Sequence, residues 1–282
     1  TGRLLDHGLP WWWVLALAAG LAAYLWCALR ARQREIAVYT ALGLGVLAIP
    51  LLADQLSYRV IFPAGAVIGI LAWWAFDRLP EAPVHAAPAS RFNVLDGLLT
   101  LVRDRRFGLY SLAFFTFGFG NLLQNPLIPM LQVDELHISD QWVGILAMTT
   151  AGVSAVFYAV WGRVLDRFNP FLTATLSFAI WGFTPFVYAA AHSVPTLLVA
   201  SILIGIAQPG IDLTWLNAVM QFADRDNIPR YASLHTFLVG IRGLLAPIIG
   251  VWMLHALRHN LRLCFLLSAV VIWLGTLLMG LV

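Results

Sequence analysis

Long apolar segments separated by short polar stretches constrain the fold of this chain most strongly. A helix needs about 20 apolar residues to cross the roughly 30 Å of hydrocarbon in a membrane. Nine segments approach that length. They are residues 11–30, 37–54, 59–77, 108–131, 141–162, 171–191, 195–219, 232–256 and 263–282.

The composition indicates that lipid is the solvent of these segments. Hydrophobic residues make up 61% of the 282 residues and charged residues only 11%. One soluble core cannot bury that much apolar surface. Backbone polar groups in lipid must be satisfied within each segment, and the sequence lacks the two-residue alternation of barrel strands. We therefore expect an all-α integral membrane protein of about nine transmembrane helices.

The distribution of arginine predicts the orientation in the membrane. All 17 basic side chains are arginines, and basic residues accumulate in cytoplasmic loops. Twelve lie in one set of alternate loops, four lie in the other set, and Arg242 lies within an apolar segment. The connection 78–107 belongs to the arginine-rich set, so we expect it in the cytoplasm of a cell with a bacterial-type inner membrane. A net charge of +3 spread over short loops does not indicate a nucleic-acid partner.

The connection 78–107 combines a linker with a second, helical pattern. It opens with RLPEAPVHAAPAS, which is typical of a flexible linker. The following NVLDGLLTLVRDRRF alternates apolar and charged positions at helical spacing. It predicts an amphipathic helix on the inner membrane surface, with its arginines near anionic lipid. A plain cytoplasmic loop is the alternative.

The sequence carries no recognisable catalytic or cofactor motif. Cys27 and Cys264 fall in separate apolar segments, which indicates neither a disulfide framework nor a metal site. No G-x-x-x-x-G-K-[ST] phosphate loop occurs, so we expect no nucleotide and no other cofactor. His235 lacks a histidine four residues further on, and no serine lies in a nucleophile elbow. We therefore expect no enzyme.

Two short motifs resemble each other, GRLLDH at Gly2–His7 and GRVLDR at Gly162–Arg167. The second lies in a cytoplasmic loop between the second and third of the six segments that follow the linker. A G-x-x-x-D-R loop at that place resembles the major facilitator superfamily. The family signature continues with glycine and basic residues, whereas Asn169 and Pro170 stand here. The arginine count places Gly2–His7 outside the cell, so we interpret it as an accidental likeness; an internal deletion that joined a signature loop to later helices is the alternative.

The resemblance implies a secondary active transporter with two six-helix halves related as a repeat. Residues 1–77 would form the last three helices of the N-terminal bundle, 78–107 the cytoplasmic linker, and 108–282 the complete C-terminal bundle, so the first three helices would be missing. Such a protein moves a small solute by alternating access, with a proton as the candidate coupling ion, and we expect a monomer surrounded by lipid. The resemblance also assigns Gly162, Asp166 and Arg167 to a conformational latch, with Asp166 near a helix N-terminus or paired with Arg163.

Charged groups inside apolar segments are costly and predict a functional site. Arg242 lies about ten residues into its segment, and Asp212 lies near the cytoplasmic end of the preceding one. Consecutive helices run antiparallel and are expected to be neighbours, so Asp212 and Arg242 would form an ion pair. This pair would either lie on the path of the solute or proton, or only stabilise the fold. His235 precedes Arg242 by two turns, either as a titratable group or as a hydrogen-bonded interfacial residue.

Amides, prolines and glycines complete the set of candidates. Asn121, Gln124 and Asn125 share one helical face and would either bind solute or join helices. Pro209, Gly210, Gly243, Pro247 and Gly250 predict helix breaks beside Asp212 and Arg242. Thr149, Thr150, Ser154 and Tyr158 are expected to be packing residues.

A non-transporting membrane scaffold, or a membrane-embedded enzyme derived from a transporter fold, is the alternative function. Nothing in the sequence identifies the solute or the direction of its movement.

Overall fold

The computed structural model describes residues 94–224 and 227–282, together with isolated helical positions at 63, 66, 69 and 70. The chain divides into two compact units, Thr1–Val84 and His85–Val282. Almost all described residues belong to the second unit. The GRLLDH motif and the first three expected transmembrane segments lie outside the described residues, apart from those four positions, so the count of nine remains a prediction.

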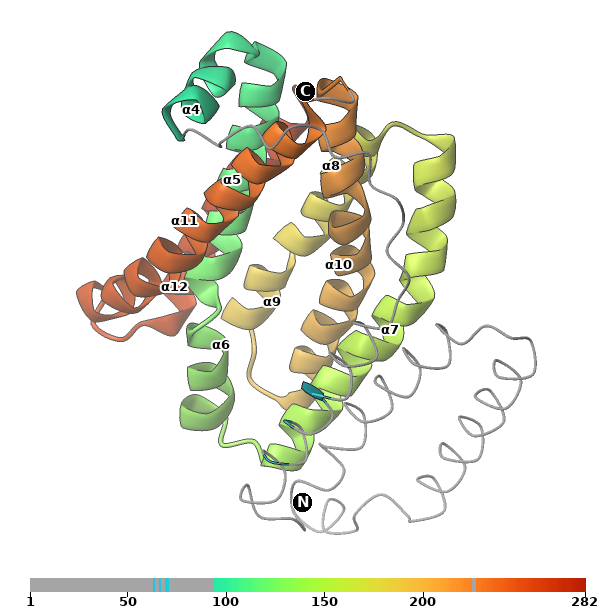
Figure 1. Cartoon of the computed structure of the whole chain (residues 1–282). Helices are drawn as coiled ribbons and strands as arrows, with labels where there is room; N and C mark the ends of the chain where they lie inside the picture. Colours follow the sequence, from blue (N-terminus) through green and yellow to red (C-terminus); the bar gives the residue numbers. More distant parts are fainter. Residues whose placement is uncertain (1–62, 64–65, 67–68, 71–93, 225–226) are drawn as a thin grey trace, which may run out of the picture. The chain divides into compact units, whose positions relative to one another are not determined.

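The described part of the second unit is helical (Figure 1). Its elements are α4 (Val94–Arg103), α5 (Arg105–Gln124), α6 (Leu127–Met130), the π-helical turn η1 (Leu131–Glu135), α7 (Asp140–Arg167), α8 (Pro170–Gly182), α9 (Thr184–Ala189), α10 (Val194–Phe222), α11 (Ile228–Ala256) and α12 (Leu261–Met279). Five spans among the described residues are long and apolar enough to cross a membrane: α7, α8 together with α9, α10, α11 and α12. For the described residues, the expectation of an all-α protein with membrane-spanning helices is confirmed.

Two of the expected helices are interrupted. The segment expected at 108–131 ends as α5 at Gln124, and a turn at Asn125–Pro126 separates it from α6 and η1. The segment expected at 171–191 divides at Phe183 into α8 and α9, and Pro185 lies in the first turn of α9. Proline lacks the N–H that a helix interior needs, and it is tolerated in a first turn.

The helix breaks expected from Pro209 and Pro247 are wrong, because α10 and α11 continue through both prolines. The nearby glycines allow close packing instead. A methyl group at Gly210 would collide with Ser177 of α8, and one at Gly250 would collide with a backbone carbonyl of α5. Gly243 has no such neighbour: an added Cβ would meet nothing within 4 Å in the described part of the chain.

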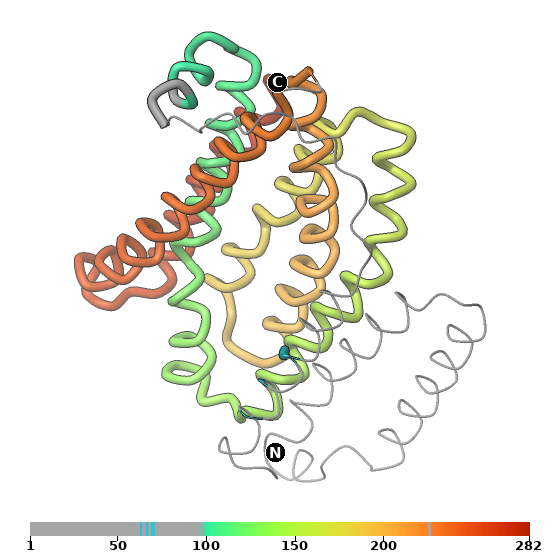
Figure 2. The backbone as a smooth tube through the Cα atoms, in the orientation of Figure 1, coloured from blue at the N-terminus to red at the C-terminus, as the bar shows by residue number. Residues whose placement is uncertain are grey.

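The helices pack as two groups that meet along α12 and α8 (Figures 1 and 2). In one group α5 packs against α11 and α12, and in the other α10 packs against α7 and α8, while α12 also contacts α8 and α9. Aromatic side chains fill the junction: the rings of Phe117 and Phe178 stack with centroids 3.7 Å apart. Gly275 lets α12 approach the backbone of Phe117 in α5.

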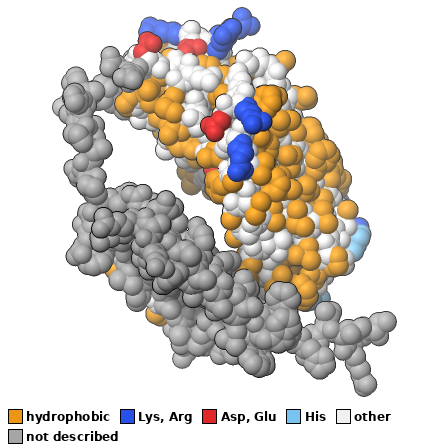
Figure 3. All heavy atoms as spheres, turned by 90° about the vertical axis from the view of Figure 1, so that its right-hand side faces the viewer, with side chains coloured by type: hydrophobic (Ala, Val, Ile, Leu, Met, Phe, Trp, Pro, Cys, Tyr) orange, Lys and Arg blue, Asp and Glu red, His pale blue; other side chains and the backbone are white. Residues whose placement is uncertain are grey.

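Large apolar side chains cover much of the outer surface, as lipid requires. Trp252 is 69% exposed and Val270 is 65% exposed, and Figure 3 shows hydrophobic side chains over most of the visible described face. Helix α4, the α7–α8 connection and the start of α11 lie at one end of the unit in Figure 1. These are arginine-rich connections of the sequence. Their cytoplasmic location, and the position of α4 on the membrane surface, remain predictions.

Candidate solute pocket

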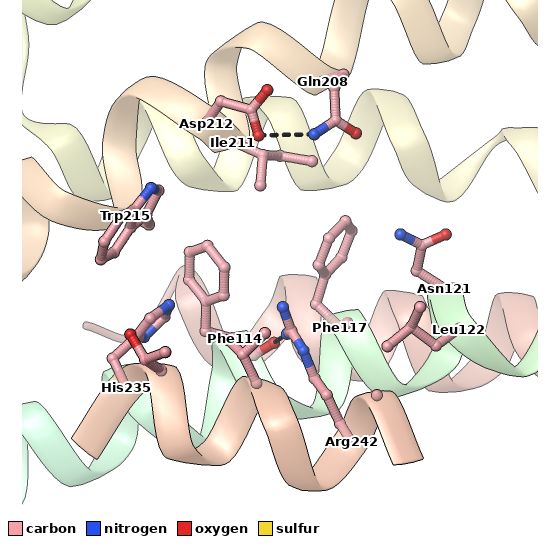
Figure 4. A pocket seen from close by; sticks show the side chains of 14 residues that line it. Phe114, Phe117, Asn121, Leu122, Gln208, Ile211, Asp212, Trp215, His235 and Arg242 are labelled. Atoms are coloured by element: carbon pink, nitrogen blue, oxygen red, sulfur yellow. Dashed lines mark hydrogen bonds between the residues drawn. The ribbon is translucent and has the colours of Figure 1, made fainter. Parts of the chain in front are cut away.

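Three helices enclose a cavity of about 470 Å³ within the second unit (Figure 4). Helix α5 contributes two phenylalanines and an amide, α10 contributes a carboxylate, an amide and an indole, and α11 contributes a guanidinium and an imidazole. The lining residues are Phe114, Phe117, Gly118, Asn121 and Leu122 of α5, Gln208, Ile211, Asp212 and Trp215 of α10, and His235, Thr236, Val239, Arg242 and Gly243 of α11.

Arg242 reaches from α11 to the backbone of α5. Its Nη1 donates a hydrogen bond to the carbonyl oxygen of Phe114, and its Cζ lies 5.7 Å from the centroid of the Phe114 ring. Gly118 makes this position possible, because a methyl group there would collide with the guanidinium. The Nε of Arg242 is buried without a hydrogen-bond partner among the described residues. A charge at such a depth costs at least about 2.5 kcal/mol on insertion, so its retention calls for a reason.

Asp212 lies on the opposite wall, on α10 (Figure 4). It has two neutral partners. The hydroxyl of Tyr158 on α7 donates to one carboxylate oxygen over 2.8 Å. Nε2 of Gln208, one turn earlier on α10, donates to the other over 2.7 Å. The ion pair expected between Asp212 and Arg242 is not present among the described residues, because both groups have closer partners on their own sides of the cavity.

His235 is part of an aromatic cluster in the cavity wall. Its ring stacks on Trp215 with centroids 5.4 Å apart and an interplanar angle of 13°. Phe114 meets it edge-on at 4.9 Å, and only 6% of the residue is exposed. Within residues 94–224 and 227–282 the ring makes no hydrogen bond, so the expectation of a hydrogen-bonded histidine does not hold there.

The amide face of α5 does not converge on the cavity. Asn121 lines it. Gln124 is 1% exposed, and its Oε1 has no hydrogen-bond partner in the described part of the chain. Asn125 is exposed, because α5 ends one residue before it. Only one of the three amides therefore faces the space that a solute would occupy.

The expected latch residues lie at the C-terminal end of α7, away from the cavity lining. Asp166 and Arg167 belong to the last turn of the helix, and Arg167 is exposed. In the part of the chain that the structure describes, Asp166 forms no ion pair with Arg163, whose Nη1 donates to a carbonyl of its own helix. The side chain of Asn169, not Asp166, caps α8 by accepting a hydrogen bond from Phe171. Around Gly162 an added Cβ would meet nothing within 4 Å in that part, so this glycine is not needed there for a close approach of two helices.

Sequence reasoning missed four residues that shape the site. Gln208 and Trp215 lie four residues before and three residues after Asp212 on one helix, a spacing that signals a shared face. Tyr158 was expected to be a packing residue, and Gly118 had no signal because its role depends on another helix.

Two threonines of α7 that were expected to be packing residues bond to backbone carbonyls, and the packing role of Ser154 remains a prediction. Thr149 and Thr150 donate to carbonyls of their own helix, and Thr150 also donates to a carbonyl of α10.

In the described residues, no three His, Cys, Asp or Glu side chains gather in a way that could hold a metal ion. The cavity instead offers one cation, one anion, amides and aromatic faces, which suit hydrogen bonding and stacking with a polar organic molecule.

Comparison with known proteins agrees with this architecture. A family model described as Major Facilitator Superfamily matches residues 110–282, more than half of the chain. A maltose permease of Geobacillus stearothermophilus is 31% identical over 152 residues, which are 52% of this chain and 38% of that protein. The match thus spans less than half of the length of the curated relative. The residues that the family model matches include every residue that lines the cavity. The chain belongs to the Major Facilitator Superfamily of membrane transporters.

Proposed function

We propose that this chain is part of a secondary active transporter that moves a small polar solute across the membrane by alternating access. The observation that carries this proposal is the cavity between α5, α10 and α11, which has opposite charges on facing walls (Figure 4). A scaffold gains nothing from two charges in membrane-spanning helices that do not pair with each other. A solute site explains their retention, because their binding partner arrives from solution.

The residues divide into three roles in this proposal. Arg242 and Asn121 contact the solute, and Trp215 and His235 form its aromatic floor. Asp212, held by two neutral donors, is the candidate carrier of a coupling proton.

The expected latch has a separate role. Gly162, Asp166 and Arg167 lie at an arginine-rich end of the unit and would change partners as the bundles rock. Gln124 and Asn125 are left to helix packing and to the end of α5.

The organisation of the complete protein follows from the same proposal. Residues 1–77 supply helices of the other bundle, 78–107 form the cytoplasmic linker, and 108–282 form the C-terminal bundle of a monomer in a bacterial-type inner membrane. Because one relative is named maltose permease, maltose is included among the solutes to assay.

Uptake by the complete protein in proteoliposomes tests the proposal. A panel of sugars, amino acids and organic acids is screened with and without an imposed proton gradient. Arg242→Leu should abolish uptake of the active solute while membrane abundance and the thermal unfolding midpoint stay near those of the wild type. Asp212→Asn should retain exchange of solute but lose its stimulation by the proton gradient.

Two results would oppose the proposal. A scaffold would be favoured if no solute in the panel is taken up while thermal unfolding shows that the protein is folded. Unchanged flux in Arg242→Leu would remove the cavity from the mechanism even if transport occurs.

A further inference from the structure

Arg242 is only partly satisfied where the structure describes it. Of its three nitrogen atoms, only Nη1 donates a hydrogen bond to a described residue, at the carbonyl oxygen of Phe114. Nε is buried without a partner there. The ring of Phe114 and a neutral carbonyl oxygen attract the guanidinium, but neither carries the full negative charge that would neutralise it.

The free nitrogens have a definite geometry. One of the two N–H groups of Nη1 is used, and four N–H groups of the guanidinium remain. Among these, the N–H of Nε and one N–H of Nη2 point the same way along one edge of the planar group. Two parallel N–H groups match the two oxygens of a carboxylate or of a phosphate, and such bidentate pairs are the strongest hydrogen bonds that arginine forms. A single hydroxyl group satisfies only one of them.

The anion in the cavity wall does not supply this partner. Both oxygens of Asp212 accept hydrogen bonds on the other side of the cavity, from Tyr158 and Gln208. Resting on the transport function proposed above, we infer that the solute carries one oxyanion, a carboxylate or a phosphate group, which pairs with the N–H groups of Arg242 that have no partner among the described residues.

The rest of the cavity limits the remainder of the solute. A second anionic group would meet Asp212, so solutes with one oxyanion are preferred, and a donor at the far end, such as an ammonium or hydroxyl group, is favoured. Phe117 and Trp215 line the space that the body of the molecule would occupy. The volume of about 470 Å³ is sufficient for a small metabolite.

Matched pairs of small molecules test this inference while the solute itself is unidentified. Each pair is an oxyanion and its neutral counterpart: lactate with lactamide, nicotinate with nicotinamide, glucuronate with glucose, and glycerol phosphate with glycerol. Binding to the complete protein in detergent is measured by thermal stabilisation over a concentration series. At least one oxyanion should stabilise the wild type, and its neutral counterpart should not. Stabilisation confined to carboxylates or to phosphates identifies which oxyanion is recognised.

The first variant replaces Arg242, and its affinity for the oxyanion is compared with that of the wild type. Arg242→Gln should raise the Kd of the bound oxyanion by about 10–100-fold, the effect of losing hydrogen bonds to a charged group. The inference is wrong if the neutral member of each pair binds as well as the anion. It is equally wrong if the preference for the anion survives in Arg242→Gln, or if no oxyanion stabilises the wild type at millimolar concentration.

Gly118 offers a second variant that leaves Arg242 in place. A methyl group at Gly118 collides only with the flexible side chain of Arg242 among its three nearest described atoms. Gly118→Ala should therefore displace the guanidinium and weaken oxyanion binding while the protein stays folded. Gly240→Ala, on the same helix as Arg242, is the control, because its added Cβ meets nothing within 4 Å in the described part. Full oxyanion affinity in Gly118→Ala would show that this position of Arg242 is not the binding position.

The two proposals fail separately. Uptake of a neutral solute that is unaffected by Arg242→Gln would overturn the oxyanion inference and leave the transporter. If the protein moves no solute but binds an oxyanion through Arg242, the proposed transport function is overturned and the proposed binding site stands.

Discussion

The hydrogen bond from Tyr158 to Asp212 joins α7 to α10 and predicts a measurable coupling between these residues. Hydrogen bonds between membrane helices contribute about 0.6 kcal/mol on average and about 1.7 kcal/mol at most in double-mutant cycles. The separation of 2.8 Å and the carboxylate acceptor favour the upper part of this range. Tyr158 is 42% exposed within the described residues, and this exposure lowers the expected coupling free energy. We expect a coupling free energy of about 1 kcal/mol.

The assay is a double-mutant cycle on the complete protein in detergent micelles. The free energy of unfolding is measured by denaturant titration for the wild type, Tyr158→Phe, Asp212→Ala and the double variant. The loss in the double variant should be smaller than the sum of the single losses by about 1 kcal/mol, because the bond can be lost only once.

A matched control separates this bond from general effects of removing a tyrosine hydroxyl. Tyr188 is 4% exposed and, among the described residues, its hydroxyl has no hydrogen bond to Asp212. Tyr188→Phe combined with Asp212→Ala should therefore be additive within about 0.3–0.5 kcal/mol. The same additivity for the Tyr158 cycle would refute the reasoning, since it would mean that the bond adds nothing to the packing of α7 against α10.

Three further predictions concern the contacts that position the cavity. Gly275→Ala places a methyl group against the backbone of Phe117, so α12 and α5 must separate, and the free energy of unfolding should fall by about 1–3 kcal/mol; an unchanged thermal midpoint would contradict this. Gly210→Ala should lower the thermal midpoint by crowding the Ser177 hydroxyl, and Ser177→Ala in the same chain should restore part of the loss. Equal midpoints for the single and double variants would show that this contact is not the cause. Asn169→Ala should cost about 1 kcal/mol of unfolding free energy by removing the cap of α8, whereas Asn169→Asp should cost little, and equal losses in a denaturant titration would exclude the cap.

The periodicity and length of apolar segments predicted most of the helices in the described part of the chain. Helices α7, α10, α11 and α12 fall where the hydropathy places them, since a segment that must leave water has few alternatives to a helix. Interruptions were harder to predict: prolines 126 and 185 accompany an interruption, whereas prolines 209 and 247 lie within continuous helices. A proline interrupts a helix when neighbouring groups do not compensate for its missing N–H, which depends on tertiary packing.

The candidate site was predicted in part. Arg242, Asp212, His235, Asn121 and Gly243 are polar or helix-breaking residues within apolar segments, and all five line the cavity. The predicted pairing of the two charges was wrong in the described structure, because adjacency in sequence order does not reveal which wall a side chain faces.

Membrane residence, helical secondary structure and the presence of opposite charges within the apolar spans were determined by the sequence alone. They follow from the cost of exposing polar groups to lipid, which acts on each segment by itself. Only the tertiary structure decided the partners of those charges. Tyr158 and Asp212 are 54 positions apart, and Arg242 bonds to a carbonyl 128 positions away beside a glycine that makes room for it. Such contacts depend on which helix faces meet, and the apolar pattern of a single segment carries no record of its neighbour.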